Sequence, residues 1–354
     1  MAAIDRLLRK LRDDGGSDLH LAVGIVPRLR KSGRLVPIEG EEVLTNESAE
    51  TLMREIASDR HWHEYQQCND ADFAYGLEGV ARFRVNYLRQ ENGYGAVLRI
   101  IPEKILTLTE LKLNPVIERL AHLHSGLILV TGPTGSGKST TLAAIIDQVN
   151  ETYAKHIITI EDPIEFVHPT KRCLVSQREV GEHTNSFANA LRSAMRQNPD
   201  VILVGEMRDP VTISLAITAA EMGVLVFGTL HTNSAVKTVD RLIDAFPADQ
   251  QNQARVSLAD SLRAVVSQLL VRTADGKGRC AVNEILLRTS ALGSIIREAR
   301  TSQLLSLIQT GKAAGMVTMD DALEKCVKEG RIAPHDAYMK AQDKAHFEKM
   351  LPPA

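Results

Sequence analysis

The chain has 354 residues and a formal net charge of −2; 44% of its residues are hydrophobic and 24% are charged. This length predicts two domains of ordinary size, each able to bury a core. The balanced charge is weak evidence against a nucleic-acid substrate, because proteins that bind DNA or RNA usually carry a basic excess. The sequence has no apolar run of roughly 18 residues and no apolar signal core, which argues against direct membrane insertion. We therefore expect a cytoplasmic protein that meets a membrane only through partners.

The four cysteines lie far apart in the sequence, at Cys68, Cys173, Cys280 and Cys326. They form no Cys-x-x-Cys pair, the spacing typical of structural zinc sites, and they show no pattern of a disulfide framework. In a reducing compartment this pattern predicts free, buried thiols.

The first hundred residues predict a small domain of helices and antiparallel strands. Residues 4–12 place their apolar side chains on one helical face, which predicts a helix docked on its own domain; a helix on a membrane surface is the alternative. Residues 48–57 predict a second helix, and Asn92-Gly93 is a typical hairpin turn. The predicted strands, bounded by Gly and Pro, are residues 19–23, 28–31, 34–38, 80–88 and 95–101.

From Leu113 the pattern changes to helical stretches that alternate with short, wholly apolar strands. Such strands are buried on both faces, which is typical of a parallel sheet covered by helices. Past Ser257 we expect mostly helix. We place a linker at residues 103–113, which gives a first domain over 1–102 and a second over 114–354. The apolar strands are residues 127–130, 157–160, 201–204 and 225–228.

A phosphate-binding pattern, Gly-x-x-x-x-Gly-Lys-Ser, spans residues 132–139, between a buried strand and a predicted helix. Its glycines let backbone N–H groups wrap the phosphates of ATP, and the helix N-terminus adds its dipole. Lys138 is expected to neutralise the β- and γ-phosphates, and the Ser139 hydroxyl to ligate Mg²⁺. A glycine-rich turn without function is the alternative, which this context disfavours. The predicted nucleotide-binding residues are Thr134, Gly135, Ser136, Gly137, Lys138, Ser139 and Thr140.

Phosphoryl transfer also needs polar groups at the ends of neighbouring strands. Glu206 follows the strand 201–204 and is the candidate general base. Gly205 stands where most P-loop proteins have a magnesium-supporting aspartate, so we expect Glu206 to support Mg²⁺ through water. Glu161, at the end of another apolar strand, is a candidate for orienting the attacking water. His231 ends a further strand, where it could sense the γ-phosphate; a hydrogen-bonded core histidine is the alternative.

Longer blocks extend this set over nearly the whole chain: residues 16–21, 79–86, 95–102, 131–141, 160–167, 203–209, 228–233 and 240–247. Together they resemble the type IV pilus retraction ATPases, the PilT family of the secretion-ATPase superfamily. The resemblance implies a PAS-like α+β N-terminal domain followed by a RecA-like α/β P-loop ATPase domain with a helical C-terminal region. It also implies a ring-shaped homohexamer in which Glu206 and Glu161 carry ATP hydrolysis.

Two arginines of the first domain, Arg84 and Arg99, match family arginines that close on the phosphates. A two-residue turn at Asn92-Gly93 pairs Arg84 with Ile101 and leaves both arginines on one face of the sheet. That arrangement suits a charge clamp for a transferred phosphoryl group. Two solvated surface arginines are the alternative.

The resemblance implies an ATP-driven motor for pilus retraction and twitching motility that works on an inner-membrane platform protein at the pilus base. The chain lacks the long N-terminal region and tetracysteine insert of the extension and type II secretion ATPases, which favours the retraction branch. Val224 replaces a family histidine, however, and residues 291–298 keep only part of a family motif. These departures support an alternative, an accessory ring with weak ATPase activity that assists a paralogous pilus ATPase. A P-loop phosphotransferase and a conjugation-type secretion ATPase are less favoured.

Overall fold

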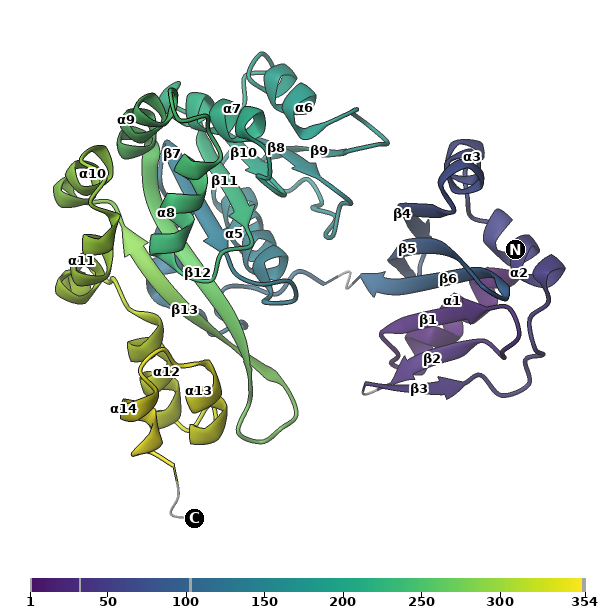
Figure 1. The fold of residues 1–354 in the computed structure, drawn as a ribbon. Helices are drawn as coiled ribbons and strands as arrows, with labels where there is room; N and C mark the ends of the chain where they lie inside the picture. The colour runs from purple at the N-terminus through teal and green to yellow at the C-terminus, as the bar shows by residue number, and fades with distance from the viewer. Residues whose placement is uncertain (1, 32, 102–103, 352–354) are drawn as a thin grey trace. The chain divides into compact units, whose positions relative to one another are not determined.

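A computed structural model describes residues 2–31, 33–101 and 104–351 (Figure 1). The chain divides into two compact units. Unit 1 comprises Met1–Lys104 with Pro163–Val167, and unit 2 comprises Ile105–Asp162 with His168–Ala354. Residues 102 and 103, where the sequence analysis ends the first domain and begins the linker, lie outside the described residues.

Unit 1 is built on an antiparallel sheet with the strand order β3-β2-β1-β6-β5-β4. Helix α1 turns its apolar side chains into the core of this unit, where Ile4, Leu7, Leu8 and Leu11 are at most 1% exposed. The helix is therefore docked on its own unit. The elements are α1 (Ala3–Asp13), β1 (Asp18–Ala22), β2 (Arg28–Lys31), β3 (Arg34–Pro37), α2 (Asn46–Arg54), α3 (Asp59–Cys68), β4 (Asp70–Leu77), β5 (Ala81–Gln90) and β6 (Gly93–Ile101).

The hairpin between β5 and β6 differs from the sequence prediction by two residues. Gln90 pairs with Gly93, so the turn lies at Glu91-Asn92 and Arg84 pairs with Arg99 instead of Ile101. The reason lies in Gly93, where a Cβ atom would overlap the side-chain amide of Asn46 in α2. Gly93 therefore serves the close approach of a helix and not the turn. A shift of two preserves the face, so both arginines still lie on one side of the sheet.

Unit 2 contains a sheet with the strand order β13-β12-β7-β11-β10-β8-β9, in which β13 alone is antiparallel to its neighbour. All four apolar strands of the sequence analysis lie in its buried centre. Helices follow the strands on both faces (Figure 1). The elements are α4 (Pro115–Leu120), β7 (Gly126–Thr131), α5 (Lys138–Thr152), β8 (His156–Glu161), β9 (Leu174–Glu179), α6 (Phe187–Ala194), β10 (Val201–Val204), α7 (Pro210–Glu221), β11 (Leu225–Leu230), α8 (Ala235–Asp244), α9 (Gln251–Ser261), β12 (Leu262–Arg272) and β13 (Arg279–Leu287).

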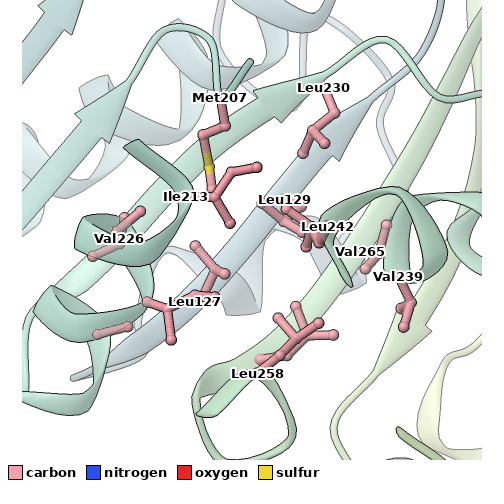
Figure 2. Packing of buried hydrophobic residues seen from close by; sticks show 14 of the residues in the cluster. Leu127, Leu129, Met207, Ile213, Val226, Leu230, Val239, Leu242, Leu258 and Val265 are labelled. Carbon is pink, nitrogen blue, oxygen red and sulfur yellow. The ribbon is translucent and has the colours of Figure 1, made fainter. Parts of the chain in front are cut away.

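The central strands of unit 2 bury both of their faces. Leu127 and Leu129 of β7 pack against α7, α8 and α9, where Figure 2 shows them beside Leu242 and Leu258. The alternate residues of β7 contribute to a second core beneath α4 and α5. A sheet fixed from both sides presents the carboxyl ends of its strands as a rigid edge.

The expectation of mostly helix past Ser257 is wrong for residues 262–287, which form the long strands β12 and β13. Both strands combine apolar residues with buried polar ones, so they lack the regular alternation that marks a half-exposed strand. Helices do follow from Ser290 onward. They are α10 (Ser290–Arg297), η1 (Thr301–Gln303), α11 (Leu304–Thr310), η2 (Gly311–Ala314), α12 (Met319–Lys328), α13 (Pro334–Lys340) and α14 (Lys344–Glu348).

None of the helices in the described part of the chain is long and apolar enough to cross a membrane. Cys173, Cys280 and Cys326 are buried, whereas Cys68 is exposed at the end of α3, so the expectation of buried thiols is wrong for Cys68. Cys68 is the last residue of α3 and lies beyond the part of the helix that is buried, which ends at Tyr65.

Candidate nucleotide site

The predicted site residues of unit 2 lie at one edge of the sheet, at the carboxyl ends of four neighbouring parallel strands. Strand β11 pairs with β7 on one side and with β10 on the other, and β8 lies beyond β10. The P-loop follows β7, His231 follows β11, Glu206 comes two residues after β10, and Glu161 ends β8. Adjacent strands lie about 4.8 Å apart, so these groups span roughly 15 Å along the edge. Ligands of open α/β sheets bind at this carboxyl edge.

The P-loop adopts a backbone that only glycine permits at its ends. Gly132 has a φ of 148°, and a Cβ atom there would overlap the Gln268 carbonyl oxygen. Gly137 has a φ of 83° and precedes the first residue of α5 as a cap without a side chain. The first N–H groups of this 15-residue helix therefore meet no capping side chain. Such an N-terminus is suited to binding phosphate.

Ser136 provides a direct test of whether this loop fits an anion. Its side chain is 3% exposed, and its Oγ atom is among the few buried polar atoms of the described residues that lack a hydrogen-bond partner. A buried hydroxyl without a partner is costly unless a ligand supplies one. Together with the glycine-lined backbone, it fits a phosphate group. The residues of the P-loop therefore suit the nucleotide that the sequence predicts.

Lys138 opens α5 with its side chain folded toward the loop and 9% exposed. Its Nζ atom donates to the carbonyl oxygens of Gly132, at 2.8 Å, and Pro133, at 3.2 Å. Ser139 and Thr140 follow in the first helical turn, half-buried, and Thr134 and Gly135 form the exposed tip of the loop. The structure thus places the seven predicted nucleotide-binding residues together around one helix N-terminus.

Glu206 lies between two cationic or protonatable partners. Its side chain is 19% exposed, forms an ion pair with Arg208, and has its Oε1 atom 3.0 Å from Nε2 of His231. Burial opposes the charge, but the ion pair with Arg208 and the contact with His231 outweigh it and hold the pKa of Glu206 below its ordinary value. Glu206 is therefore a carboxylate at neutral pH. The alternative of a core histidine does not fit His231, which is 46% exposed.

The absence of the usual aspartate at Gly205 has a steric explanation. A Cβ atom on Gly205 would lie 3.1 Å from the Ile160 carbonyl oxygen and 3.2 Å from Cα of Glu161. The Gly205 N–H also donates to Ile160, at 2.8 Å. A side chain at this position would therefore require β8 to move by a few tenths of an ångström. The first carboxylate that can follow β10 is Glu206.

Glu161 ends β8 and is held by its own neighbours. Thr159 Oγ1 donates to its Oε1 atom at 2.7 Å, and Gln177 Nε2 from β9 donates to the same atom at 3.2 Å. These bonds fix the carboxylate at the sheet edge. Its distance from the P-loop, about three strand spacings, suits a residue that acts through water and not on the phosphates directly.

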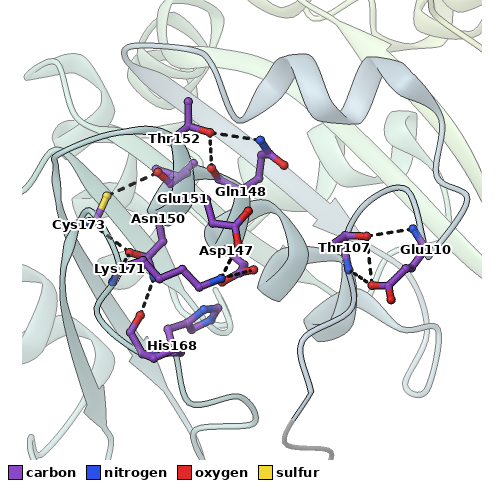
Figure 3. A network of polar contacts seen from close by, with 12 residues as sticks. Thr107, Glu110, Asp147, Gln148, Asn150, Glu151, Thr152, His168, Lys171 and Cys173 are labelled. Atoms are coloured by element: carbon purple, nitrogen blue, oxygen red, sulfur yellow. Dashed lines mark hydrogen bonds and ion pairs between the residues drawn. The ribbon is translucent and has the colours of Figure 1, made fainter.

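The loop after β8 is tied to the P-loop helix by a polar network (Figure 3). Asn150 is fully buried and bonds three backbone groups of the loop, the Pro169 carbonyl and the N–H groups of Lys171 and Cys173. Lys171 also bridges the carboxylates of Asp147 and Glu151 on α5. These bonds fix the segment 169–173 to the C-terminal half of α5.

The sequence analysis missed Gln268, which braces the P-loop from β12. Its side chain is 1% exposed. Its Nε2 atom donates to the Ser136 carbonyl at 2.7 Å, and its Oε1 atom accepts from Thr141 at 2.8 Å and from Asn283 at 2.9 Å. The available signal was the polar residue Gln268 among the apolar residues of the segment 262–272. Because this segment was predicted to be helical, the signal did not indicate a position beside the P-loop.

Arg84 and Arg99 belong to unit 1, where they lie directly opposite each other on β5 and β6. Arg84 forms an ion pair with Asp72 of β4, at 2.7 Å, and Arg99 one with Asp18 of β1, at 2.7 Å. Their side chains are 44% and 68% exposed. Both guanidinium groups are therefore exposed on one face of this sheet, as is Asp72, whereas the Asp18 carboxylate is buried.

Comparison with known proteins decides the family. Residues 3–342 match the family described as Type II/IV secretion system protein. The chain belongs to this family. The type IV pilus retraction ATPase PilT of Pseudomonas aeruginosa is 48% identical over 97% of this chain and 99% of its own length. The type IV pilus ATPase PilU of the same bacterium is 39% identical over 98% of this chain and 91% of its own length.

A solved structure agrees with these relatives. The crystal structure of the pilus retraction motor PilT with bound ADP has a TM-score of 0.90 and 41% identity, and covers 99% of this chain and 100% of that one. The resemblance to secretion ATPases is confirmed, and so is the predicted fold of an N-terminal domain followed by an ATPase domain. The chain is an ATPase of this family that binds nucleotide.

Proposed function

We propose that this chain is the ATP-hydrolysing subunit of a homohexameric motor that powers type IV pilus retraction, and with it twitching motility. It acts at the inner-membrane base of the pilus on a platform protein. The observation that carries the proposal is the set of site residues on one sheet edge, in a chain that matches PilT over 99% of that protein's length. Similarity over the whole chain favours a shared function, because a nucleotide-binding domain shared by itself would give similarity over only part of the chain.

In this proposal the sheet edge of unit 2 binds and hydrolyses ATP. The N–H groups at the start of α5 and the Lys138 ammonium hold the phosphates. Ser139 and, through water, Glu206 would hold a magnesium ion, which would neutralise negative charge on the phosphates. Glu206 accepts the proton of the attacking water while Glu161 orients that water, and His231 contacts the γ-phosphate. The low pKa of Glu206 keeps it ready to accept a proton.

Arg84 and Arg99 supply further positive charge in this proposal. Their position opposite each other on one sheet face supports a paired action on a phosphoryl group. The Arg84–Asp72 pair is exposed on both sides and such pairs contribute only about 0–1 kcal/mol, so Arg84 leaves Asp72 when stronger negative charge arrives. Asp18 is buried, but Arg30 and Ser17 also contact its carboxylate, so it keeps partners when Arg99 moves. Movement of unit 1 with the nucleotide cycle then drives the work of the ring.

The first of the two arguments for an accessory role, the replacement of a family histidine by Val224, concerns a position far from the proposed phosphate site. Val224 lies just before β11, next to Gly126 at the start of β7, whereas the phosphate site lies at the other ends of these strands. Six strand residues separate the two ends by about 20 Å. The missing histidine therefore removes no group from the sheet edge that binds phosphate. PilT is also more similar to this chain than PilU, at 48% against 39% identity.

The second argument, the altered segment 291–298, concerns helix α10. Leu292, Ile295 and Ile296 are buried in the core of unit 2, and Arg297 bonds Asp260 of α9. An accessory subunit with a paralogous pilus ATPase as its partner remains the competing outcome of the experiment below.

The test is retraction itself, measured in a bacterium with type IV pili whose own retraction ATPase genes have been deleted. The chain is expressed alone, as wild type or as Lys138→Ala, and retraction of labelled pili is scored while light scattering gives the mass of the purified protein. We expect a hexamer that restores retraction only in the wild-type form. A hexamer that hydrolyses ATP but restores retraction only together with a second retraction-type ATPase would establish the accessory role instead.

A further inference from the structure

The loop that carries His231 leads into a helix whose start is held by a buried carboxylate. Three residues, 232–234, separate His231 from Ala235, the first residue of α8. The Ala235 N–H donates to Oε1 of Glu284 on β13 at 2.7 Å, and this glutamate is 2% exposed. The N-terminus of α8 is therefore fixed to the sheet, and the His231 loop, residues 231–234, is anchored where it meets the helix.

Helix α8 carries a buried hydroxyl group among apolar side chains. Thr238 is fully buried, and Val239 beside it packs with Leu242 in the core of unit 2 (Figure 2). A buried hydroxyl group costs free energy unless it is hydrogen-bonded. Valine would fill nearly the same space without that cost, so the Thr238 hydroxyl contributes only through its partners.

The partners of Thr238 come from its own helix, from the His231 loop and from the residue before the P-loop. Its hydroxyl donates to the Ser234 carbonyl at 2.7 Å, and its Oγ1 atom lies 2.6 Å from Oγ1 of Thr232. Oγ1 of Thr131 lies 3.4 Å away on the other side. The bond with Thr232 is much the shorter of the two contacts between side chains and therefore the stronger. Thr238 thus holds the residue next to His231.

The backbone around Glu206 is held separately, from β11. The Thr229 hydroxyl donates to the Gly205 carbonyl, and the Met207 N–H donates to the Thr229 carbonyl at 3.0 Å. These two bonds fix the backbone on both sides of Glu206. The contact of 3.0 Å between Glu206 and His231 therefore depends on how the His231 loop is held.

We propose that Thr238 is a positioning residue for ATP hydrolysis: its hydroxyl group holds Thr232 and so keeps His231 in contact with Glu206. The inference rests on the proposed function, in which Glu206 is the base and His231 contacts the γ-phosphate. Thr238 itself touches neither the nucleotide nor the attacking water and acts through its neighbour. Loss of the hydroxyl should therefore lower the rate of hydrolysis, because a small displacement of a reacting group is costly, and leave ATP binding by the P-loop nearly unchanged.

The test measures kcat and KM for ATP in Thr238→Val, which removes the hydroxyl, and in Thr238→Ser, which keeps it. The control is Thr218→Val on α7, because Thr218 makes the same bond within its helix, to the Ser214 carbonyl at 2.9 Å. We expect kcat to fall about tenfold in Thr238→Val alone, with KM within about twofold of the wild type in all three variants. Light scattering and the thermal unfolding midpoint show which variants are folded hexamers. A folded Thr238→Val with unchanged kcat, or an equal loss in Thr238→Ser, would overturn the proposal.

A second variant, Thr232→Val, removes the same bond from the other side. Thr232 is half-buried, so its replacement disturbs the core less than a change at Thr238 and serves if Thr238→Val does not fold. We expect the same fall in kcat with KM retained. Wild-type kcat in the folded Thr232→Val protein would show that this bond does not position His231.

A double-mutant cycle with His231→Ala separates positioning from a general loss of packing. If Thr238 acts through His231, adding Thr238→Val to His231→Ala lowers kcat no further, so the two losses are not additive. Additive losses would overturn the inference and leave the proposed function standing. Wild-type kcat in His231→Ala alone would instead remove His231 from the proposed mechanism, and the inference with it.

Discussion

The sheet edge of unit 2 and the arginine face of unit 1 hold their charged residues in different ways. Glu206 is 19% exposed, stands on buried strands, and is fixed by His231 and Arg208. Arg84 and Arg99 are 44% and 68% exposed and bond only to carboxylates of their own sheet among the contacts given above. The first arrangement is preorganised, whereas the guanidinium groups of the second are exposed and change partners more readily. We therefore expect the sheet edge of unit 2 to set both nucleotide binding and proton transfer, and the arginines of unit 1 to affect only the rate.

The largest effect on nucleotide binding is expected for Lys138→Ala, on the preorganised side. Loss of the ammonium group that faces the phosphates should weaken ATP binding and lower hydrolysis by on the order of 10²–10³-fold. The measurement is steady-state phosphate release with Mg²⁺, together with binding of a fluorescent ATP analogue. Lys155→Ala is the control, since this lysine packs over the Tyr153 ring at the opposite end of β8. A Lys138→Ala protein with unchanged hydrolysis would remove the P-loop from the site.

Arg99→Ala and Arg84→Ala test the other side of the comparison. Each should lower kcat by roughly 10–100-fold and leave nucleotide affinity nearly unchanged, because these groups act on charge that develops during the reaction. The control is Arg89→Ala, on the strand of Arg84, where the Arg89 guanidinium packs over the Tyr94 ring. If both variants lose affinity and keep kcat, the arginines belong to binding, and the division of labour between the units is wrong.

Gln268→Leu sharpens the account of the P-loop. The side chain is similar in size, but the Ser136 carbonyl loses its donor, and Thr141 and Asn283 lose their acceptor. Leaving such groups unpaired in the interior costs about 1–3 kcal/mol each. We expect nucleotide affinity to fall about tenfold while the hexamer persists. Unchanged affinity in a folded variant would show that the loop keeps its shape without this brace.

The smallest effect concerns His168, a buried histidine of unit 2. Burial lowers its pKa to about 4 from 6.5, although Asp147 opposes this shift. Between these values the unfolded chain binds a proton that the folded chain does not, so stability falls as the pH falls. At pH 5 the loss is about 2 kcal/mol.

Hydrogen exchange of β8 and β10 at pH 7 and pH 5 measures this change. His168→Gln should remove most of the pH dependence, whereas His63→Gln, an exposed position in unit 1, should leave it in place. A slope that survives in His168→Gln would assign the pH dependence to another group.

The same contrast explains what the sequence could predict. In unit 2 the apolar strands at 127–130 and 201–204 predicted both the parallel sheet and the edge at which Lys138 and Glu206 lie. A wholly apolar strand indicates a position in a sheet that is buried on both faces. Gln268 was not predicted because its partners at the P-loop, Ser136 and Thr141, lie more than a hundred residues away, and no local pattern reports such contacts.

In unit 1 the signals are weaker. Strand β4 was missed because only Ala71 and Phe73 are fully buried along it, so it has little apolar pattern. The β5–β6 register depends on α2 packing against Gly93, a contact that no turn rule contains. Half-exposed strands owe their position to neighbours far away in the sequence, and a local pattern cannot include those.

The most direct test of the central claim is the reaction of Glu206→Gln with ATP. ATP binding and Mg²⁺-dependent hydrolysis are measured on the same hexameric preparation, beside the wild type. Glutamine keeps the size of the side chain but cannot accept the proton of the attacking water, so we predict wild-type affinity with hydrolysis lowered by about 10²–10⁴-fold. Hydrolysis at the wild-type rate would contradict the assignment of Glu206 as the base, and with it the mechanism proposed for this edge of the sheet.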